Sequence, residues 1–262
     1  MNPVSRLRLP AAIAAFVLAI VCALLTVTTW AMTSSNPFFT TGPQAALETA
    51  IRAGDVERIA GAIAGGASVN AAGKFNVTPL MVAVDAQRPR AVQALLKAGA
   101  NPNAVAQDGN GPVGLAVKSY LAKPFGRDIM LAIFQGGGDP DTRRPDGDPV
   151  LMQFVYDRNV GGLRLMKELG ANLDIVDKAG DPMVLSVAMS QDWDMAWALI
   201  ELGAAYDYED GKSRWPLSLA LKGTYPSPDS PLYPYKRKIW QLLKDKGLLR
   251  EPIKGFDPDA RP

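Results

Sequence analysis

The sequence predicts an all-α fold in which helical hairpins of about 33 residues stack behind one N-terminal transmembrane helix. Gly-Ala or a close variant recurs with successive spacings of 33, 38, 33 and 33 residues, beginning at Gly66, Gly99, Gly137, Gly170 and Gly203. A proline that opens an apolar segment recurs in phase, at Pro79, Pro112, Pro149, Pro182 and Pro216. Two markers that keep one period indicate a solenoid of repeated units.

The transmembrane helix is predicted from residues 9–32, a run of 24 residues without a charged side chain. As an α-helix this segment would be about 36 Å long, enough to cross a bilayer. Arg6 and Arg8 precede it, so the positive-inside rule puts the N-terminus in the cytoplasm and the rest of the chain across the membrane. A cleaved signal peptide is the alternative, with Thr29 and Ala31 as the small residues before the cut.

These features divide the chain into four parts. Residues 1–32 are expected to be the signal anchor, 33–42 a short linker, 43–250 the repeat domain and 251–262 a C-terminal tail. The last predicted helix, KRKIWQLLKDKG at 236–247, is expected to keep its lysines outside and to bury Ile239, Leu242 and Leu243. Such a helix would close the stack with one polar face.

Composition limits the chemistry that the domain can perform. The chain has no His, and its one Cys, Cys22, lies in the uncharged N-terminal segment. The commonest general base, disulfides within the folded part and Cys/His zinc sites are thereby excluded. After Arg6 and Arg8, the 26 basic residues balance the 26 acidic ones, which gives little general attraction for nucleic acid. We therefore predict no enzyme, no cofactor, no metal and no nucleic-acid partner.

The repeat markers have direct physical roles. Pro79 would preset φ at a helix start, where its missing N–H has no partner to lose. Small residues such as Ala83 would let one helix approach its neighbour closely, and Leu95 would fill the space between second helices. Gly99 would supply the left-handed residue that ends the second helix. A single hairpin cannot bury its apolar face alone, so several units are needed for stability.

Residues 77–104, VTPLMVAVDAQRPRAVQALLKAGANPNA, resemble the ankyrin repeat, with its TPL, its VxxLLxxGA helix and its Asn-rich turn. The resemblance extends over about residues 43–249 and implies five to six units. The third unit carries an insertion near 120–128, the fourth and fifth place their proline one position early, and the sixth is degenerate. No unit has the family's usual His after TPL.

The resemblance implies a protein-binding module whose turn tips and exposed first-helix ends line a concave face. By position, the turn candidates are Phe75, Val77, Asn110, Asp148, Asp181 and Arg214, and the helix-end candidates are Arg52, Asp85, Lys118, Tyr156, Asp157, Met189 and Lys222. Phe75 has two interpretations, an anchor for a partner or a packing contact with the next turn. Met189 has the same two, whereas Tyr156 favours an interface because its ring has a polar end.

The anchor and the repeats together suggest a bacterial inner-membrane protein with its repeats in the periplasm, or a soluble periplasmic or secreted protein if the segment is cleaved. A tether would hold an inhibitor where a secreted toxin acts. By analogy with membrane-tethered ankyrin proteins of bacteria, one hypothesis is an immunity protein that binds an antibacterial type VI lipase-type effector. The alternatives are a general envelope scaffold or stress-related adaptor without a toxin partner, and a secreted protein that acts on a host.

Overall fold

The computed structural model describes residues 37–208, 216–222 and 226–249. The chain divides into two compact units, Met1–Phe38 and Phe39–Pro262, and the helices below belong to the second. The predicted anchor, Arg214 and the predicted tail at 251–262 lie outside the described residues. In the described part of the chain, no helix is long and apolar enough to cross a membrane.

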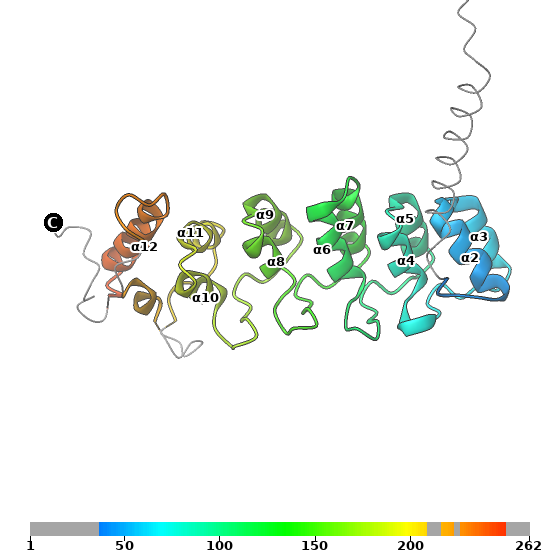
Figure 1. Cartoon of the computed structure of the whole chain (residues 1–262), viewed down its shortest axis with the longest axis horizontal. Helices are drawn as coiled ribbons and strands as arrows, with labels where there is room; N and C mark the ends of the chain where they lie inside the picture. Colours follow the sequence, from blue (N-terminus) through cyan, green and yellow to red (C-terminus); the bar gives the residue numbers. More distant parts are fainter. Residues whose placement is uncertain (1–36, 209–215, 223–225, 250–262) are drawn as a thin grey trace, which may run out of the picture. The chain divides into compact units, whose positions relative to one another are not determined.

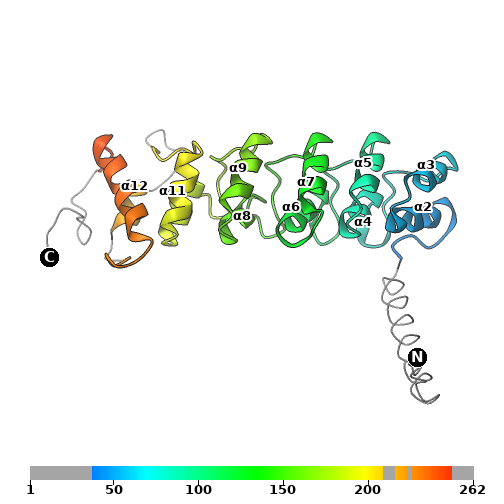
Figure 2. The same cartoon turned by 90° about the horizontal axis from the view of Figure 1, so that it is seen from above.

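The described residues of the second unit form helical pairs that follow one another in chain order (Figure 1), and Figure 2 shows the same order from above. The pairs are α2 (Gly42–Ala53) with α3 (Val56–Ala64), α4 (Pro79–Asp85) with α5 (Pro89–Lys97), α6 (Pro112–Ala122) with α7 (Gly126–Gln135), α8 (Met152–Tyr156) with α9 (Val160–Glu168), α10 (Met183–Met189) with α11 (Trp193–Glu201), and the 3-10 helix η2 (Leu217–Leu221) with α12 (Tyr233–Asp245). A short 3-10 turn, η1 (Lys74–Asn76), lies in the loop before α4. The predicted all-α repeat array is confirmed over these ranges.

Each of these six pairs ends in the same backbone cap. The capping residues are all glycines with φ between 69° and 98°: Gly66, Gly99, Gly137, Gly170, Gly203 and Gly247. At Gly99 the N–H donates to the Leu96 carbonyl at 3.0 Å, and the next N–H, of Ala100, donates to the Leu95 carbonyl at 2.9 Å. The same two hydrogen bonds end the second helix of each of the other five pairs. Glycine is favoured because a Cβ is disfavoured at this φ. The glycines that repeat about every 33 residues in the sequence therefore mark the ends of the second helices.

A side chain four residues after each of four capping glycines, Gly66, Gly99, Gly137 and Gly170, joins one repeat to the next. Asn103 donates through Nδ2 to the Gly137 carbonyl at 2.9 Å and accepts through Oδ1 from the Asp139 N–H at 2.8 Å. Asn70 makes the same pair of hydrogen bonds one repeat earlier, with the Gly99 carbonyl and the Asn101 N–H. In the later repeats Asp141 and Asp174 accept the corresponding N–H of Asn172 and Ala205. This ladder sets the offset between neighbouring repeats.

In the fourth repeat, a large side chain stands where the second repeat has a small one. Phe154 in α8 is fully buried, and its ring meets the ring of Tyr120 in α6 edge-on, with centroids 5.4 Å apart. Counted back from the capping glycine, Phe154 occupies the position that Ala83 holds in the second repeat. Room for the ring comes from Gly162 in α9, where a Cβ would lie 2.1 Å from Phe154 Cδ1. The two positions therefore depend on each other.

Three sequence expectations are corrected. Pro149 does not begin a helix, because it bridges to Arg143 in the loop and α8 begins at Met152. Pro182 likewise bridges to Val176 and precedes α10 as its cap. Lys236, expected on the outside of the last helix, is fully buried, with Nζ 5.1 Å from the Trp193 ring centroid. In the same helix Ile239 and Leu243 are buried as predicted, so the α12 face turned toward α11 includes a cation.

We predict that Gly162→Ala destabilises the domain by about 1–3 kcal/mol, because the new methyl group overlaps the Phe154 ring and a packed core relaxes only partly. Gly161→Ala is the matched control in the same helix, since a Cβ there meets only Asn159 Oδ1, at 3.5 Å. The control should be neutral or slightly stabilising, because alanine favours a helix more than glycine does. Urea unfolding followed by circular dichroism measures both variants. Equal midpoints for the two would contradict the Phe154–Gly162 packing.

The second prediction concerns Lys236, whose burial lowers its pKa to about 8 from an ordinary value of 10.5. Between these two pH values the unfolded chain binds more protons than the folded one, so this residue makes stability rise with pH across that window. Lys236→Met should therefore stabilise the domain at pH 7 by roughly 1–3 kcal/mol, and the gain should shrink as the pH approaches 10.5. Chemical denaturation at several pH values tests this. The exposed Lys246→Met should show no such dependence, and a gain that stays constant with pH would rule out the explanation.

Candidate functional site

The first-helix ends present the same position of each repeat to solvent. Asp85, Tyr156 and Met189 each lie 14 residues before a capping glycine, and Lys118 is the corresponding residue of α6. All four are exposed, Tyr156 by 53% and Met189 by 52%. Arg52 occupies the same position in α2 but is tied to buried Glu48 at 2.8 Å. The predicted helix-end residues thus form a row, called here the recognition row, defined as Arg52, Asp85, Lys118, Tyr156, Asp157, Met189 and Lys222.

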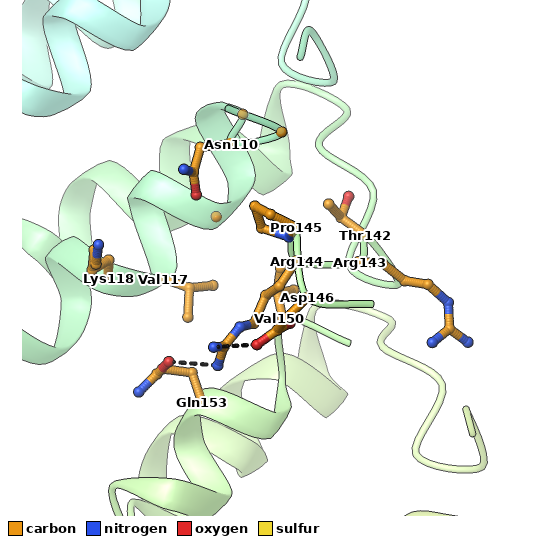
Figure 3. Close-up of a pocket in the computed structure, with 13 residues that line it drawn as sticks. Asn110, Val117, Lys118, Thr142, Arg143, Arg144, Pro145, Asp146, Val150 and Gln153 are labelled. Carbon is orange, nitrogen blue, oxygen red and sulfur yellow. Dashed lines mark hydrogen bonds and ion pairs between the residues drawn. The ribbon is translucent and has the colours of Figure 1, made fainter. Parts of the chain in front are cut away.

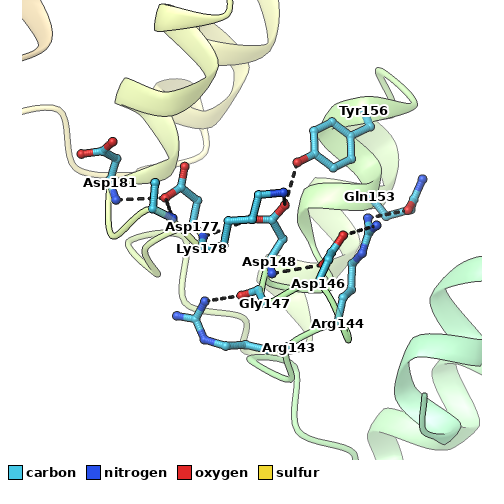
Figure 4. A network of polar contacts seen from close by, with 11 residues as sticks. Arg143, Arg144, Asp146, Gly147, Asp148, Gln153, Tyr156, Asp177, Lys178 and Asp181 are labelled. Carbon is cyan, nitrogen blue, oxygen red and sulfur yellow. Dashed lines mark hydrogen bonds and ion pairs between the residues drawn. The ribbon is translucent and has the colours of Figure 1, made fainter. Parts of the chain in front are cut away.

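In the fourth repeat, the row is joined to a buried carboxylate (Figure 4). Asp148 is 2% exposed, and its Oδ2 accepts a hydrogen bond from the Tyr156 hydroxyl at 2.9 Å. Its Oδ1 accepts the backbone N–H of Lys178, in the following turn, at 3.0 Å, and Lys178 Nζ lies 3.3 Å from Oδ2. Asp148 therefore does not offer its carboxylate to a partner; it fixes Tyr156 and the next turn in place. Nothing in the sequence indicated the role of Lys178.

The contacts of Asp148 and Tyr156 determine the protonation states of both side chains. Burial alone would raise the pKa of Asp148, but the hydrogen bonds from the Lys178 N–H and the Tyr156 hydroxyl, together with the Lys178 ammonium, bring it below the ordinary 3.8. The pKa of Tyr156 is raised by burial and by its hydrogen bond to Asp148. At neutral pH the pair is therefore a carboxylate that holds a phenol, which suits positioning.

Arg144 extends this network toward solvent. Its guanidinium donates to Gln153 Oε1 and to Asp146 Oδ2, each at 2.8 Å, and lies 5.8 Å from the centroid of the Tyr156 ring. Gln153 in turn donates to Asp157 at 2.8 Å. The structure thus brings Tyr156, Asp157 and Asp148 together. Arg144 and Gln153, which the sequence did not single out, connect Tyr156 and Asp157.

The turn candidates other than Arg214 lie in the loops that precede α4, α6, α8 and α10, and these loops project from one side of the row of helices (Figure 1). Phe75 is 67% exposed with φ of 59°, and its carbonyl accepts the Gln107 N–H of the next loop at 2.8 Å. Because the Phe75 side chain is exposed, it does not fill the second of its two interpreted roles, a packing contact with the next turn. Val77 and Asp181 are half-buried, and Asn110 donates to Asp108 at 2.8 Å. That bond is the main reason the pKa of Asp108 is lowered, with Lys118 adding a smaller effect.

A cleft of about 260 Å³ lies between the third and fourth repeats (Figure 3). It is lined by two predicted residues, Asn110 and Lys118, and by residues that the sequence analysis did not select: Gly109, Gly111, Gly114, Val117, Thr142, Arg143, Arg144, Pro145, Asp146, Val150 and Gln153. Within the described residues, no group of three or more His, Cys, Asp or Glu side chains could hold a metal. The geometry combines anchored aromatic and charged side chains with an open, partly apolar hollow.

We predict that Tyr156→Phe lowers stability by about 1 kcal/mol at pH 7, because buried Asp148 loses one of its donors. A lowered carboxylate pKa stabilises the fold above pH 3.8 and ceases to do so as the pH falls through the folded value. The difference between wild type and variant should therefore shrink on acidification below pH 4. Urea unfolding at pH 7 and pH 3 measures it. Tyr120→Phe, which keeps the ring contact with Phe154, is the control; a difference for Tyr156→Phe that does not change with pH would contradict the hydrogen bond.

Comparison with known proteins identifies the repeat. The family model of the ankyrin repeat matches residues 75–107. Over 113 residues the chain is 34% identical to E3 ubiquitin-protein ligase KEG of Arabidopsis thaliana, a match that covers 43% of this chain and 7% of that protein. Because the chain spans so small a share of this relative, its ligase activity carries no implication here. The matched residues contain α4, α5 and the Gly99 cap, so residues 75–107 are an ankyrin repeat, and the paired helices and glycine caps of this repeat recur in the other described pairs.

Proposed function

We propose that the repeats bind a folded protein partner through the recognition row and the adjoining turn tips. Ankyrin repeats are protein–protein interaction modules, and one observation supports this face. The helix-end position of successive repeats is exposed and carries Asp85, Lys118, Tyr156 and Met189, which differ in charge, size and polarity. The capping position of the same repeats is always glycine. A constant scaffold with a chemically varied exposed row is what specific recognition requires.

Tyr156 is the proposed central anchor of this surface. Its ring is half-exposed, its hydroxyl is held by Asp148, and Arg144 lies over one face. Tyrosine and arginine are frequent among the residues that contribute most to binding. Tyrosine in addition buries a large area with only two rotatable side-chain bonds. Since these side chains are already ordered by Asp148, Asp146 and Gln153, binding would cost little additional conformational entropy.

We propose further that residues 9–32 tether the repeats at the periplasmic face of an inner membrane. The uncharged length of the segment and the preceding Arg6 and Arg8 support this location. A tethered binder in that compartment suits an inhibitor of a secreted antibacterial effector. A scaffold or adaptor in the envelope is the competing function. The nature of the captured protein separates them: an enzyme whose activity falls on binding supports the inhibitor, and a resident envelope protein supports the adaptor.

The face is tested by site-specific photo-crosslinking of the full-length chain in membranes. A photoreactive phenylalanine analogue at position 156 or 118 should give a discrete crosslinked protein, whereas the same analogue at the exposed second-helix residue Arg164 should not. Tyr156→Ala should reduce the yield of the position 118 crosslink about tenfold or more, the loss expected for a central anchor. Crosslinks at 164 without crosslinks at 156 and 118 would show that another surface binds.

A further inference from the structure

The cleft between the third and fourth repeats exists because one side chain is absent. Gly114 is the third residue of α6, and the third residue of α4 is Met81, which is 2% exposed. In the fourth and fifth repeats, the corresponding residues, 18 before the capping glycine, are Met152 and Leu185, both buried. A Cβ on Gly114 would meet no atom within 4 Å. Space that a buried apolar side chain fills in three other repeats is therefore open here.

The walls of this space come from two repeats and are held in place. Val117 of α6 and Val150, just before α8, give it an apolar interior, and Pro145 packs against Gly109 across the two neighbouring loops, with 3.2 Å between Pro145 Cβ and an ideal Cβ on Gly109. Arg144 is fixed by Asp146 and Gln153, as Figure 3 shows. Because this wall is already ordered, binding a partner costs little further conformational entropy there.

The size of the cleft limits what it can accept. Pockets for drug-sized ligands and cofactors have volumes of roughly 300–1,000 Å³, whereas this cleft has about 260 Å³ and is open at one side. A single large side chain from a protein partner fits that range. Pockets of this kind commonly receive the aromatic anchors of an interface.

The charge of the lining indicates what lies beside that side chain. The cleft is bordered by three cations, Lys118, Arg143 and Arg144, and by one carboxylate, Asp146, which is paired with Arg144 at 2.8 Å. Neither Lys118 nor Arg143 is in an ion pair with any residue that the structure describes. Arg143 points away from the hollow in Figure 3, so Lys118, whose ammonium also acts on the Asp108 carboxylate, is the cation with which a bound acidic group would pair.

We propose that this cleft receives an aromatic side chain of the protein partner, with an adjacent acidic residue of the same partner pairing with Lys118. The inference rests on the proposed function, because it names the chemistry that the recognition row selects. Lys118 belongs to both surfaces, and Gln153 and Arg144 connect the cleft to Tyr156, so one partner segment can contact all of them.

The test uses the full-length chain and a short peptide probe, acetyl-Asp-(4-fluoro-Phe)-Gly-amide, observed by 19F NMR. The expected dissociation constant is on the order of 1 mM, as for other ligands of this size. Gly114→Met, which places in α6 the side chain found at position 81, should weaken binding about tenfold or more. Gly61→Met is the matched control, because Gly61 is also a helical glycine whose Cβ would meet no atom within 4 Å, and it lies in α3 away from the cleft.

The acidic preference is tested by exchanging charges. The probe with Lys in place of Asp should bind about fivefold more weakly to wild type, and Lys118→Glu should reverse that order, as expected for a close charge pair. Lys97→Glu, at an exposed lysine of α5, should leave the order unchanged. Equal binding of the two peptides, or equal binding to the Gly114→Met and Gly61→Met variants, would overturn the proposal. Binding of free 4-fluorophenylacetate without binding of the peptide would also overturn it, in favour of a small-molecule site.

The experiments distinguish a failure of the cleft proposal from a failure of the proposed function. If position 118 crosslinks a partner but Gly114→Met leaves that crosslink unchanged, the recognition row binds and the cleft proposal is wrong. If the peptide binds in the cleft but neither position 156 nor position 118 captures a protein, the cleft chemistry stands and the proposed function fails.

Discussion

The burial of apolar side chains between neighbouring helical pairs is the constraint on which the rest of this structure depends. A five-residue helix such as α8 could not persist alone in water, because nucleating a helix is costly and so few hydrogen bonds follow. It persists because Met152, Phe154 and Val155 are buried in the array. The capping glycines and the Asn70 and Asn103 hydrogen bonds then hold each pair at one offset from the next. Packing supplies the stabilisation, and the caps and ladder supply the register.

The division between packing positions and exposed positions explains how such an array can carry a binding surface. Substitution at Asp85, Lys118 or Met189 changes a side chain that faces solvent, so these positions can differ without disturbing the helices, whereas Tyr156 also holds buried Asp148. Substitution at a capping glycine would put a Cβ into a left-handed backbone conformation. The same physical rule that keeps the caps uniform therefore leaves the recognition row free to vary.

The junction between the third and fourth repeats departs most from this regularity. Three departures meet there: the absent side chain at Gly114, the large ring of Phe154 with its compensating Gly162, and the buried carboxylate of Asp148. Irregular packing between otherwise equivalent units therefore leaves a hollow with anchored polar side chains beside it.

The sequence by itself determined the all-α fold class, the period and the ends of the second helices, because those depend on local rules: a glycine such as Gly99 ends a helix in the left-handed conformation that other residues disfavour. It also placed the exposed row, since Asp85 and Tyr156 keep a fixed distance from a capping glycine. Only the tertiary structure decided that Asp148 is buried beneath Tyr156 and Lys178, that Lys236 lies inside the last helix pair, and that the space beside Gly114 stays open. These outcomes depend on which side chains of different repeats meet. Periodicity states that two repeats are neighbours but not whether their side chains fill the space between them.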